Sequence, residues 1–284
     1  MGGVSLLELW WVFPAAVIFS TIAIGSGVSG ALFFSPFFML AVGLSPVQAV
    51  GAGLLTEVFG MGNGLRAYVT VRLVDYATAK WLLAGAVPGV IAGAIAADTV
   101  PSGVLKMIFG GGLLVLAGFL ILVRTPEECE PGDRSSKLID RKSEGKGTTE
   151  IRARDGSVYT YPTCWRPPGV TLAAVGALLT GMISAGLPEI STTQLVVRCR
   201  VPPRVAIATS VFTLAVVAAL GAAVHAFHAE PVWNVVMWSI PGVLVGSTLG
   251  SRLGKYFPAK VMERALGVVF GLVGALLLGL ELWK

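Results

Sequence analysis

The chain has 284 residues, of which 55% are hydrophobic and only 13% are charged, and its mean hydropathy is +0.79. Polar side chains this scarce cannot cover a water-soluble globule of this size, so the composition excludes an ordinary soluble domain and favours a chain embedded in lipid. The net charge of +5 does not indicate nucleic-acid binding, because the Lys and Arg residues lie in short loops between apolar segments.

The apolar segments fall into two groups of five. A membrane helix needs about 20 mainly apolar residues. In residues 1–124 we expect membrane segments near 7–27, 31–43, 47–66, 76–97 and 103–124. In residues 167–284 we expect them near 169–187, 190–200, 204–225, 232–251 and 260–282. The first is expected to be a retained span, since no basic region precedes it and no small-residue cleavage site follows it. The segments 31–43 and 190–200 are too short to cross a bilayer, so we expect half-helices.

Residues 125–166 form a polar insert, because 16 of these 42 residues are charged. The part through about residue 149 is predicted to be loose. Residues 151–161 alternate around Asp155–Gly156, a pattern typical of a small β-hairpin. A regulatory or docking element and a plain linker between the halves are both compatible with this composition.

The two apolar groups are related in sequence. Pro46, Ala49 and Thr56 match Pro203, Ala206 and Thr213 at an offset of 157 residues, and Pro88–Gly89 and Gly93 match Pro241–Gly242 and Gly246 at 153. Pro101 matches Pro258 at 157 again. Such duplication is typical of transporter folds. The glycines that recur every four residues predict close helix packing: Gly85, Gly89, Gly93, Gly242, Gly246, Gly250 and Gly254.

Basic residues in short loops predict the topology. They gather at three connections: Arg66, Arg72 and Lys80; Arg198, Arg200 and Arg204; and Arg252, Lys255, Lys260 and Arg264. The intervening connections carry only Lys106. The positive-inside rule then places the insert in the cytoplasm and both chain ends outside. We therefore predict an all-α polytopic membrane protein of two inverted-topology repeats, each with five membrane segments that include one half-helix.

Two segments predict breaks in membrane helices, residues 25–36 and 181–194, because both are rich in Gly, Ser and Pro. Irregular backbone at membrane depth is tolerated only where it lines a cavity or is buried in protein. The half-helices that start at these breaks are expected to point their N-termini at each other, so that unpaired amides and positive dipole ends form an anion site. Hydroxyl groups of Ser29, Ser191, Thr192 and Thr193 would add neutral donors.

Polar residues on the helices from 47 and from 204 extend this hypothesis. Thr209, Ser210 and Thr213 share a face with Ala206, and Thr56 and Asn63 lie on the repeat partner. Cavity lining and helix–helix hydrogen bonding are the two interpretations of these groups. The candidate substrate-binding residues are Gly27, Ser29, Gly30, Ala31, Thr56, Asn63, Glu189, Ile190, Ser191, Thr192, Thr193, Thr209, Ser210 and Thr213.

Two acids lie within apolar segments, Glu57 and Glu189. An ionisable group at that depth is costly and suggests a function. Glu189 is placed either to cap its own half-helix or to couple anion binding to protonation. Glu57 is a second candidate for proton coupling, or a member of a structural pair with a residue such as Arg66.

Other motifs predict no further chemistry. Gly25-x-Gly27-x-x-Gly30 matches a dinucleotide fingerprint but follows a membrane helix rather than a β-strand, so we reject it. His225 and His228 are expected at the surface. The cysteines, Cys129, Cys164 and Cys199, lack metal-ligand spacing and are expected to be reduced thiols. We expect no enzyme, cofactor or metal.

Two motifs resemble the sulfite exporter TauE/SafE family of permeases. They are Gly27-Val-Ser-Gly-Ala-Leu-Phe-Phe-Ser-Pro36 and Pro203-Arg-Val-Ala-Ile-Ala-Thr-Ser210, one in each membrane half. The resemblance implies transport of a small sulfur-containing anion, such as sulfite or an organosulfonate, across a bacterial or archaeal cytoplasmic membrane. Its partners would be that anion and the lipid bilayer, and the sequence predicts no oligomeric state. The alternatives are an anion channel and a membrane scaffold or sensor that acts through the insert.

Overall fold

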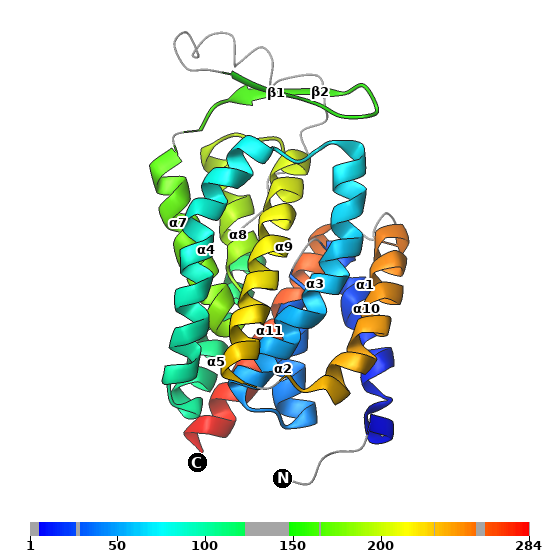
Figure 1. Ribbon diagram of the computed structural model, residues 1–284, viewed down its shortest axis with the longest axis vertical. Helices are drawn as coiled ribbons and strands as arrows, with labels where there is room; N and C mark the ends of the chain where they lie inside the picture. Colours follow the sequence, from blue (N-terminus) through cyan, green and yellow to red (C-terminus); the bar gives the residue numbers. More distant parts are fainter. Residues whose placement is uncertain are drawn as a thin grey trace.

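A computed structural model describes residues 6–26, 29–122, 148–164, 166–229, 231–253 and 259–283. The helices form one bundle, with a β-hairpin across one end and the start of the first helix and the end of the last helix at the other (Figure 1). We call these ends the hairpin side and the termini side.

The elements follow the predicted order. After a 3₁₀ turn at Leu6–Leu9, the first half contains α1 (Val12–Ser26), α2 (Ala31–Phe37) with a π-helical turn (Phe38–Val42), α3 (Pro46–Val71), α4 (Tyr76–Thr99) and α5 (Ser102–Leu122). Strands β1 (Thr148–Arg152) and β2 (Val158–Pro162) come next. The second half contains α7 (Arg166–Ile183), α8 (Leu187–Thr193) with a π-helical turn (Gln194–Arg198), α9 (Pro203–His228), α10 (Trp233–Leu253) and α11 (Ala259–Leu282).

The helices match an all-α membrane protein in composition. Among the described residues, three helical segments are long and apolar enough to cross a membrane: Tyr76–Thr99, Pro203–His228 and Ala265–Leu282. Four shorter apolar helices accompany them: Val12–Ile24, Ala31–Val42, Ser102–Gly118 and Pro167–Ile183.

Local signals fix the starts of α3 and α4. Ser45 accepts a hydrogen bond from the Gln48 amide, and the Gln48 side chain accepts one from the Ser45 amide, which is a capping box before Pro46 at the first helical position. The Asp75 carboxylate caps α4 by accepting hydrogen bonds from the amides of Ala77 and Thr78.

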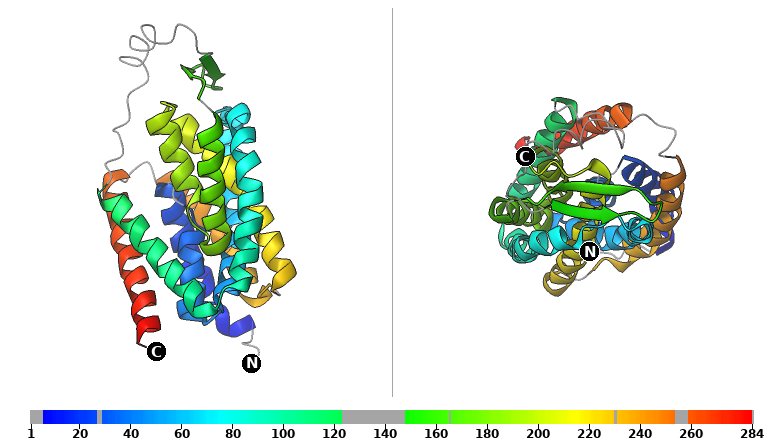
Figure 2. Two further views of the ribbon diagram at one scale, coloured as in Figure 1. Left: turned by 90° about the vertical axis from the view of Figure 1, so that its left-hand side faces the viewer. Right: turned by 90° about the horizontal axis from the view of Figure 1, so that it is seen from above.

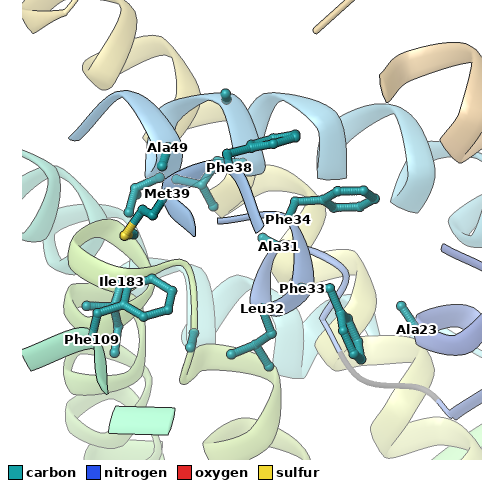
Figure 3. Close-up of a cluster of buried hydrophobic side chains, with 14 of the residues drawn as sticks. Ala23, Ala31, Leu32, Phe33, Phe34, Phe38, Met39, Ala49, Phe109 and Ile183 are labelled. Atoms are coloured by element: carbon teal, nitrogen blue, oxygen red, sulfur yellow. The ribbon is translucent and has the colours of Figure 1, made fainter. Parts of the chain in front are cut away.

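The two half-helices lie inside the bundle. α2 runs from its middle toward the termini side, and α8 runs from its middle toward the hairpin side (Figures 1 and 2). Aromatic packing holds α2: Phe33 stacks on Phe19 and contacts Phe270, and Phe37 meets Trp11 edge to face. Figure 3 shows Phe33 and Phe34 projecting from α2 into this buried cluster.

The insert contains the hairpin around Asp155 and Gly156. Thr148 pairs with Pro162 and Arg152 with Val158 in an antiparallel register, and Gly156 has a φ of 85° in the turn. The prediction of reduced thiols is wrong for Cys164 and Cys199, which form a disulfide with their Cα atoms 5.2 Å apart. Sequence spacing gave no signal for this pair, because only the fold brings the end of the hairpin beside the turn that follows α8. Cys129 lies outside the described residues.

Glycine stripes join the halves, as their spacing predicted. On α4, Gly85, Gly89 and Gly93 face the backbone carbonyls of Val170, Ala174 and Leu178 on α7. On α10, Gly242, Gly246 and Gly250 face those of Phe13, Val17 and Thr21 on α1. Close approach of this kind is how small residues drive helix association in lipid. Gly254 lies outside the described residues.

Replacing one of these glycines by alanine is expected to destabilise the bundle. A Cβ at Gly89 would meet the carbonyl oxygen of Ala174 and lie 3.1 Å from its Cα, so Gly89→Ala forces the two backbones apart. We expect a loss of about 1–3 kcal/mol, typical of overpacking, measured as a lower midpoint of thermal unfolding in detergent. Gly118→Ala is the control, because a Cβ there meets nothing within 4 Å. Equal stability of the two variants would contradict the packing role of the stripe.

Candidate functional site

The two breaks differ in how their backbone turns. Between α7 and α8 the chain reverses over three residues: Ser184 has a φ of 59° and Gly186 a φ of 122°. Glycine suits the second position because it has no Cβ to clash. Between α1 and α2 the described part of the break is Ser29 and Gly30, both buried. The candidate residue Gly27 lies outside the described residues.

Two side chains cap the N-terminus of α8. The Gly186 amide donates to Oε2 of Glu189 at 3.1 Å, and the Leu187 amide donates to Oγ1 of Thr180 at 3.0 Å. Glu189 therefore takes, in this structure, the capping role that the sequence left as one of two alternatives. Thr180 was not among the predicted residues, since nothing in its sequence context distinguishes it from other helix threonines.

Glu57 lies at the N-terminus of the other half-helix, α2. The Ser29 hydroxyl donates to Oε1 of Glu57 at 2.6 Å, and the carboxylate lies against the backbone amides of Gly30 and Ala31 at the start of α2. Glu57 is 2% exposed. The hypothesis of a pair with Arg66 is wrong, because Arg66 lies further along α3 with an exposed side chain and Ser29 is the partner instead.

The two acids belong to one site. Glu57 is within electrostatic range of Glu189, and the Glu189 carboxylate also lies near the backbone amide of Ser29. A direct hydrogen bond joins the two breaks as well: Ser35 on α2 donates to Ser184 at 2.9 Å. Both half-helix N-termini and both acids thus meet in the interior. Ser35 and Ser184 were not predicted as site residues, because their pairing depends on how the halves pack.

Several buried polar side-chain atoms on α3, α8 and α9 have no hydrogen-bond partner within the described ranges. They are Oε2 of Glu57, Oε1 of Glu189, and the hydroxyl oxygens of Ser191 and Ser210. Buried polar groups are normally paired, so orphaned ones suggest an unseen ligand or water. A space of about 10 Å³ adjoins Glu57 and Gly30, enough for one water molecule.

The remaining candidates contact neighbouring helices. Thr56 hydrogen-bonds Ser239 on α10 at 2.8 Å, and the Asn63 amide donates to Ser247 at 3.0 Å. Thr209 accepts from the Asp75 amide at 3.0 Å, and Thr213 donates to the Thr209 carbonyl. These contacts are of the helix–helix and intrahelical kind that the sequence left open beside cavity lining. Three further candidates on α8 are half-buried: Ile190, Thr192 and Thr193.

A cavity of about 330 Å³ lies on the termini side between the first half of α3, the last part of α9 and the start of α10. Its lining is mainly apolar, with Gln48 and His225 as the polar members. Gly51 and Ala52 on one wall follow Val50, whose carbonyl accepts a 3.5 Å hydrogen bond from Ser184. The cavity therefore borders the broken region of the bundle.

The prediction that His225 lies at the surface is wrong. It is 2% exposed rather than a surface residue, and its Nε2 lies 2.8 Å from the carbonyl oxygen of Gly181. Because a carbonyl only accepts, Nε2 carries the hydrogen and donates. Its burial was missed because the last turns of α9 were taken to flank an exposed loop, whereas the His225 side chain lies against Gly181 of α7. His228 is exposed, as expected. Within the described ranges, no three metal-binding side chains cluster.

One family model and two curated relatives match this chain. A model of the family described as sulfite exporter TauE/SafE matches residues 12–277. The probable membrane transporter protein YunE of Bacillus subtilis is 24% identical over 93% of both chains. The probable membrane transporter protein MamO of Magnetospirillum gryphiswaldense is 24% identical over 93% of this chain and 44% of its own length. No solved structure matches.

The Ser29–Glu57 hydrogen bond is expected to show strong energetic coupling. In a double-mutant cycle of Ser29→Ala and Glu57→Gln, we expect a coupling of about 1.5–3 kcal/mol, the range for hydrogen bonds to charged groups. The measurement is the free energy of unfolding in bicelles. A control cycle pairs Ser29→Ala with Glu281→Gln, whose ion-pair partner is Lys106 on α5. Coupling no larger than in the control would contradict the bond.

Proposed function

Because the chain belongs to the sulfite exporter TauE/SafE family and is a membrane permease, we propose that its substrate is a small sulfur-containing anion, sulfite or an organosulfonate. We further propose that the two halves are inverted repeats that give alternating access to a site between the half-helices. The observation that carries the proposal is the meeting of both half-helix N-termini with Ser29, Glu57 and Glu189.

Helix packing supports the inverted repeats. If residues 1–124 correspond to 167–284, then α1 corresponds to α7 and α4 to α10. Under this exchange the α1–α10 contact maps onto the α7–α4 contact, and the α3–α9 and α5–α11 contacts map onto themselves. The glycine stripes at 85–93 and 242–250 follow the same exchange. The opposite courses of α2 and α8 agree with it too (Figure 1).

The topology proposal uses the same arrangement. The loops that carry Arg72 and Arg200, and the start of α9 with Arg204, lie at the hairpin side. Lys106 on α5 lies at the termini side near Glu281. By the positive-inside rule the hairpin side is cytoplasmic and both chain ends are outside.

The half-helix amides are the proposed anion ligands, with hydroxyls such as Ser191 and Ser210 as further donors. Helix N-termini bind anions through free N–H groups and the positive end of the dipole. In this structure the protein's own carboxylates occupy those positions, since Glu189 accepts from Gly186 and Glu57 faces Gly30 and Ala31. A substrate anion therefore has to displace a carboxylate of the same charge.

Proton coupling follows from this competition. When a proton neutralises Glu189, its carboxyl group no longer competes as an anion for the α8 amides, and the substrate takes its place. Release of the anion lets the carboxylate ionise and cap the helix again. Each anion would then move together with a proton. The cavity beside His225 is the proposed approach from the termini side.

Uptake into proteoliposomes tests this proposal. We expect labelled sulfite or a sulfonate to enter faster than sulfate, with flux that increases as the external pH falls. Glu189→Gln cannot exchange a proton, so its flux is expected to lose the pH dependence and to fall about tenfold, which corresponds to about 1.4 kcal/mol. Glu281→Gln is the matched control, expected to behave as the wild type.

Counterflow separates a carrier from a channel. Unlabelled substrate on the opposite side should accelerate tracer exchange if the site alternates between sides, whereas a channel shows no such acceleration. Normal transport by Glu189→Gln with unchanged pH dependence would refute proton coupling through this residue.

A further inference from the structure

The hairpin is docked on the bundle rather than detached from it. Seen from the hairpin side, β1 and β2 cross the middle of the helix ends (Figure 2). The Tyr161 hydroxyl donates to Oδ2 of Asp75 at 2.9 Å, and the Arg154 amide donates to the Val71 carbonyl at 2.9 Å. Asp75 is the cap of α4, so the hairpin is attached to the α3–α4 connection.

Apolar contacts complete the docking. Ala153, Tyr159 and Tyr161 are buried and belong to one hydrophobic cluster with residues beneath them, namely the loop residues Leu73, Val74 and Val201 and, at the start of α9, Val205. Burial, with the adjacent Asp75 carboxylate, raises the pKa of Tyr161 well above its ordinary value. The tyrosine therefore remains protonated and keeps donating at physiological pH.

The docked hairpin lies over the ends of α3 and α9 that are opposite the cavity. The cavity on the termini side is lined by residues of α3 between Val47 and Phe59 and by residues between Ala219 and Ala229 at the end of α9. The hairpin lies over the opposite end, where α3 ends at Val71 and α9 begins at Pro203. The hairpin therefore lies at the hairpin-side end of the substrate path proposed above.

The disulfide ties that cover to the candidate site. Cys164 follows β2 by two residues, and Cys199 ends the π-helical turn that continues α8, the half-helix capped by Glu189. Cys164 is half-buried, whereas Cys199 is buried, so Cys164 is the more accessible of the two residues. The exposed residues Arg198 and Arg200 flank Cys199 in sequence. Positive charge attracts anions and stabilises a departing thiolate.

We propose that the Cys164–Cys199 bridge is a sulfite-reactive site that locks the hairpin over the hairpin-side ends of α3 and α9. The sulfur lone pair of sulfite attacks Sγ of Cys164, the S–S bond breaks, and its electron pair leaves on Cys199 as thiolate. Cys164 then carries an S-sulfonate. The reverse attack of the Cys199 thiolate on Cys164 expels sulfite and restores the bridge, so the step needs no other oxidant or reductant.

This inference rests on the proposed function, because it takes sulfite as the anion and the hairpin side as cytoplasmic. Lasting disulfides are unusual in the cytoplasm, where they are mostly transient or regulatory. A bridge that sulfite opens there would release the cover when sulfite accumulates and close it again as export lowers the concentration.

Intact-mass measurement tests the chemistry without depending on transport. The experiment uses the full-length protein with Cys129→Ser, which leaves Cys164 and Cys199 as the remaining cysteines. This variant is incubated in detergent with sulfite or with sulfate. We expect one added SO₃ group in sulfite, mapped to Cys164 by peptide analysis, and none in sulfate. Removal of sulfite should reverse the mass change. A bridge that remains intact in sulfite, or sulfonate found on Cys199 instead, would overturn the proposed site.

Hydrogen exchange tests the lock. After sulfite treatment, amides of residues 148–162 are expected to exchange at least about tenfold faster, while amides of α4 and α7 remain unchanged. Cys164→Ser/Cys199→Ser should exchange fast with or without sulfite, and Tyr161→Phe with the bridge intact should show only a partial increase. Cleavage that leaves hairpin exchange unchanged would overturn the lock. Absence of flux in liposomes, with these two results intact, would instead count against the proposed function.

Discussion

Every backbone amide at membrane depth needs a partner, because the hydrocarbon offers none. A helix that starts in the middle of the bundle exposes its first N–H groups there, and this constraint shapes the centre of the structure. Glu189 and Thr180 satisfy the start of α8, and Glu57, held by Ser29, faces the start of α2. The same groups that make broken helices tolerable are thus the donors for which, in the proposed mechanism, an anion and a carboxylate compete.

Packing in the rest of the bundle holds these two breaks in position. Two glycine stripes let α1 meet α10 and α4 meet α7 at backbone distance, which fixes the outer pairs without large side chains. Phenylalanines on α2 fill the space beside α1 and α11 and hold the half-helix. Two half-helices with seven α-helical residues each would have little stability alone, so their direction depends on this packing.

Sequence patterns predicted the parts that depend on local composition. Apolar runs, Gly–Ser–Pro breaks and the Asp155–Gly156 turn each mark their element within a few residues, and four-residue glycine spacing identified the contact stripes. Contacts between distant segments had no such signal. The Ser35–Ser184 bond, the Cys164–Cys199 bridge and the burial of His225 against Gly181 each join residues at least 35 positions apart. Duplication identifies equivalent helices but does not specify which side chains meet where the two copies pack.

The proposed inverted repeats would make the two ends of the bundle equivalent, yet here the ends differ. At the termini side a cavity lies between α3 and α9, and at the hairpin side the hairpin lies over the corresponding helix ends. The hairpin belongs to the insert, which has no counterpart in the duplication, so it can change without disturbing the paired glycine contacts. Because its attachments reach the cap of α4 through Tyr161 and the end of α8 through Cys164, a change in the hairpin acts on both halves at once. The proposed control of access from one side therefore lies in a segment outside the proposed symmetry of the halves.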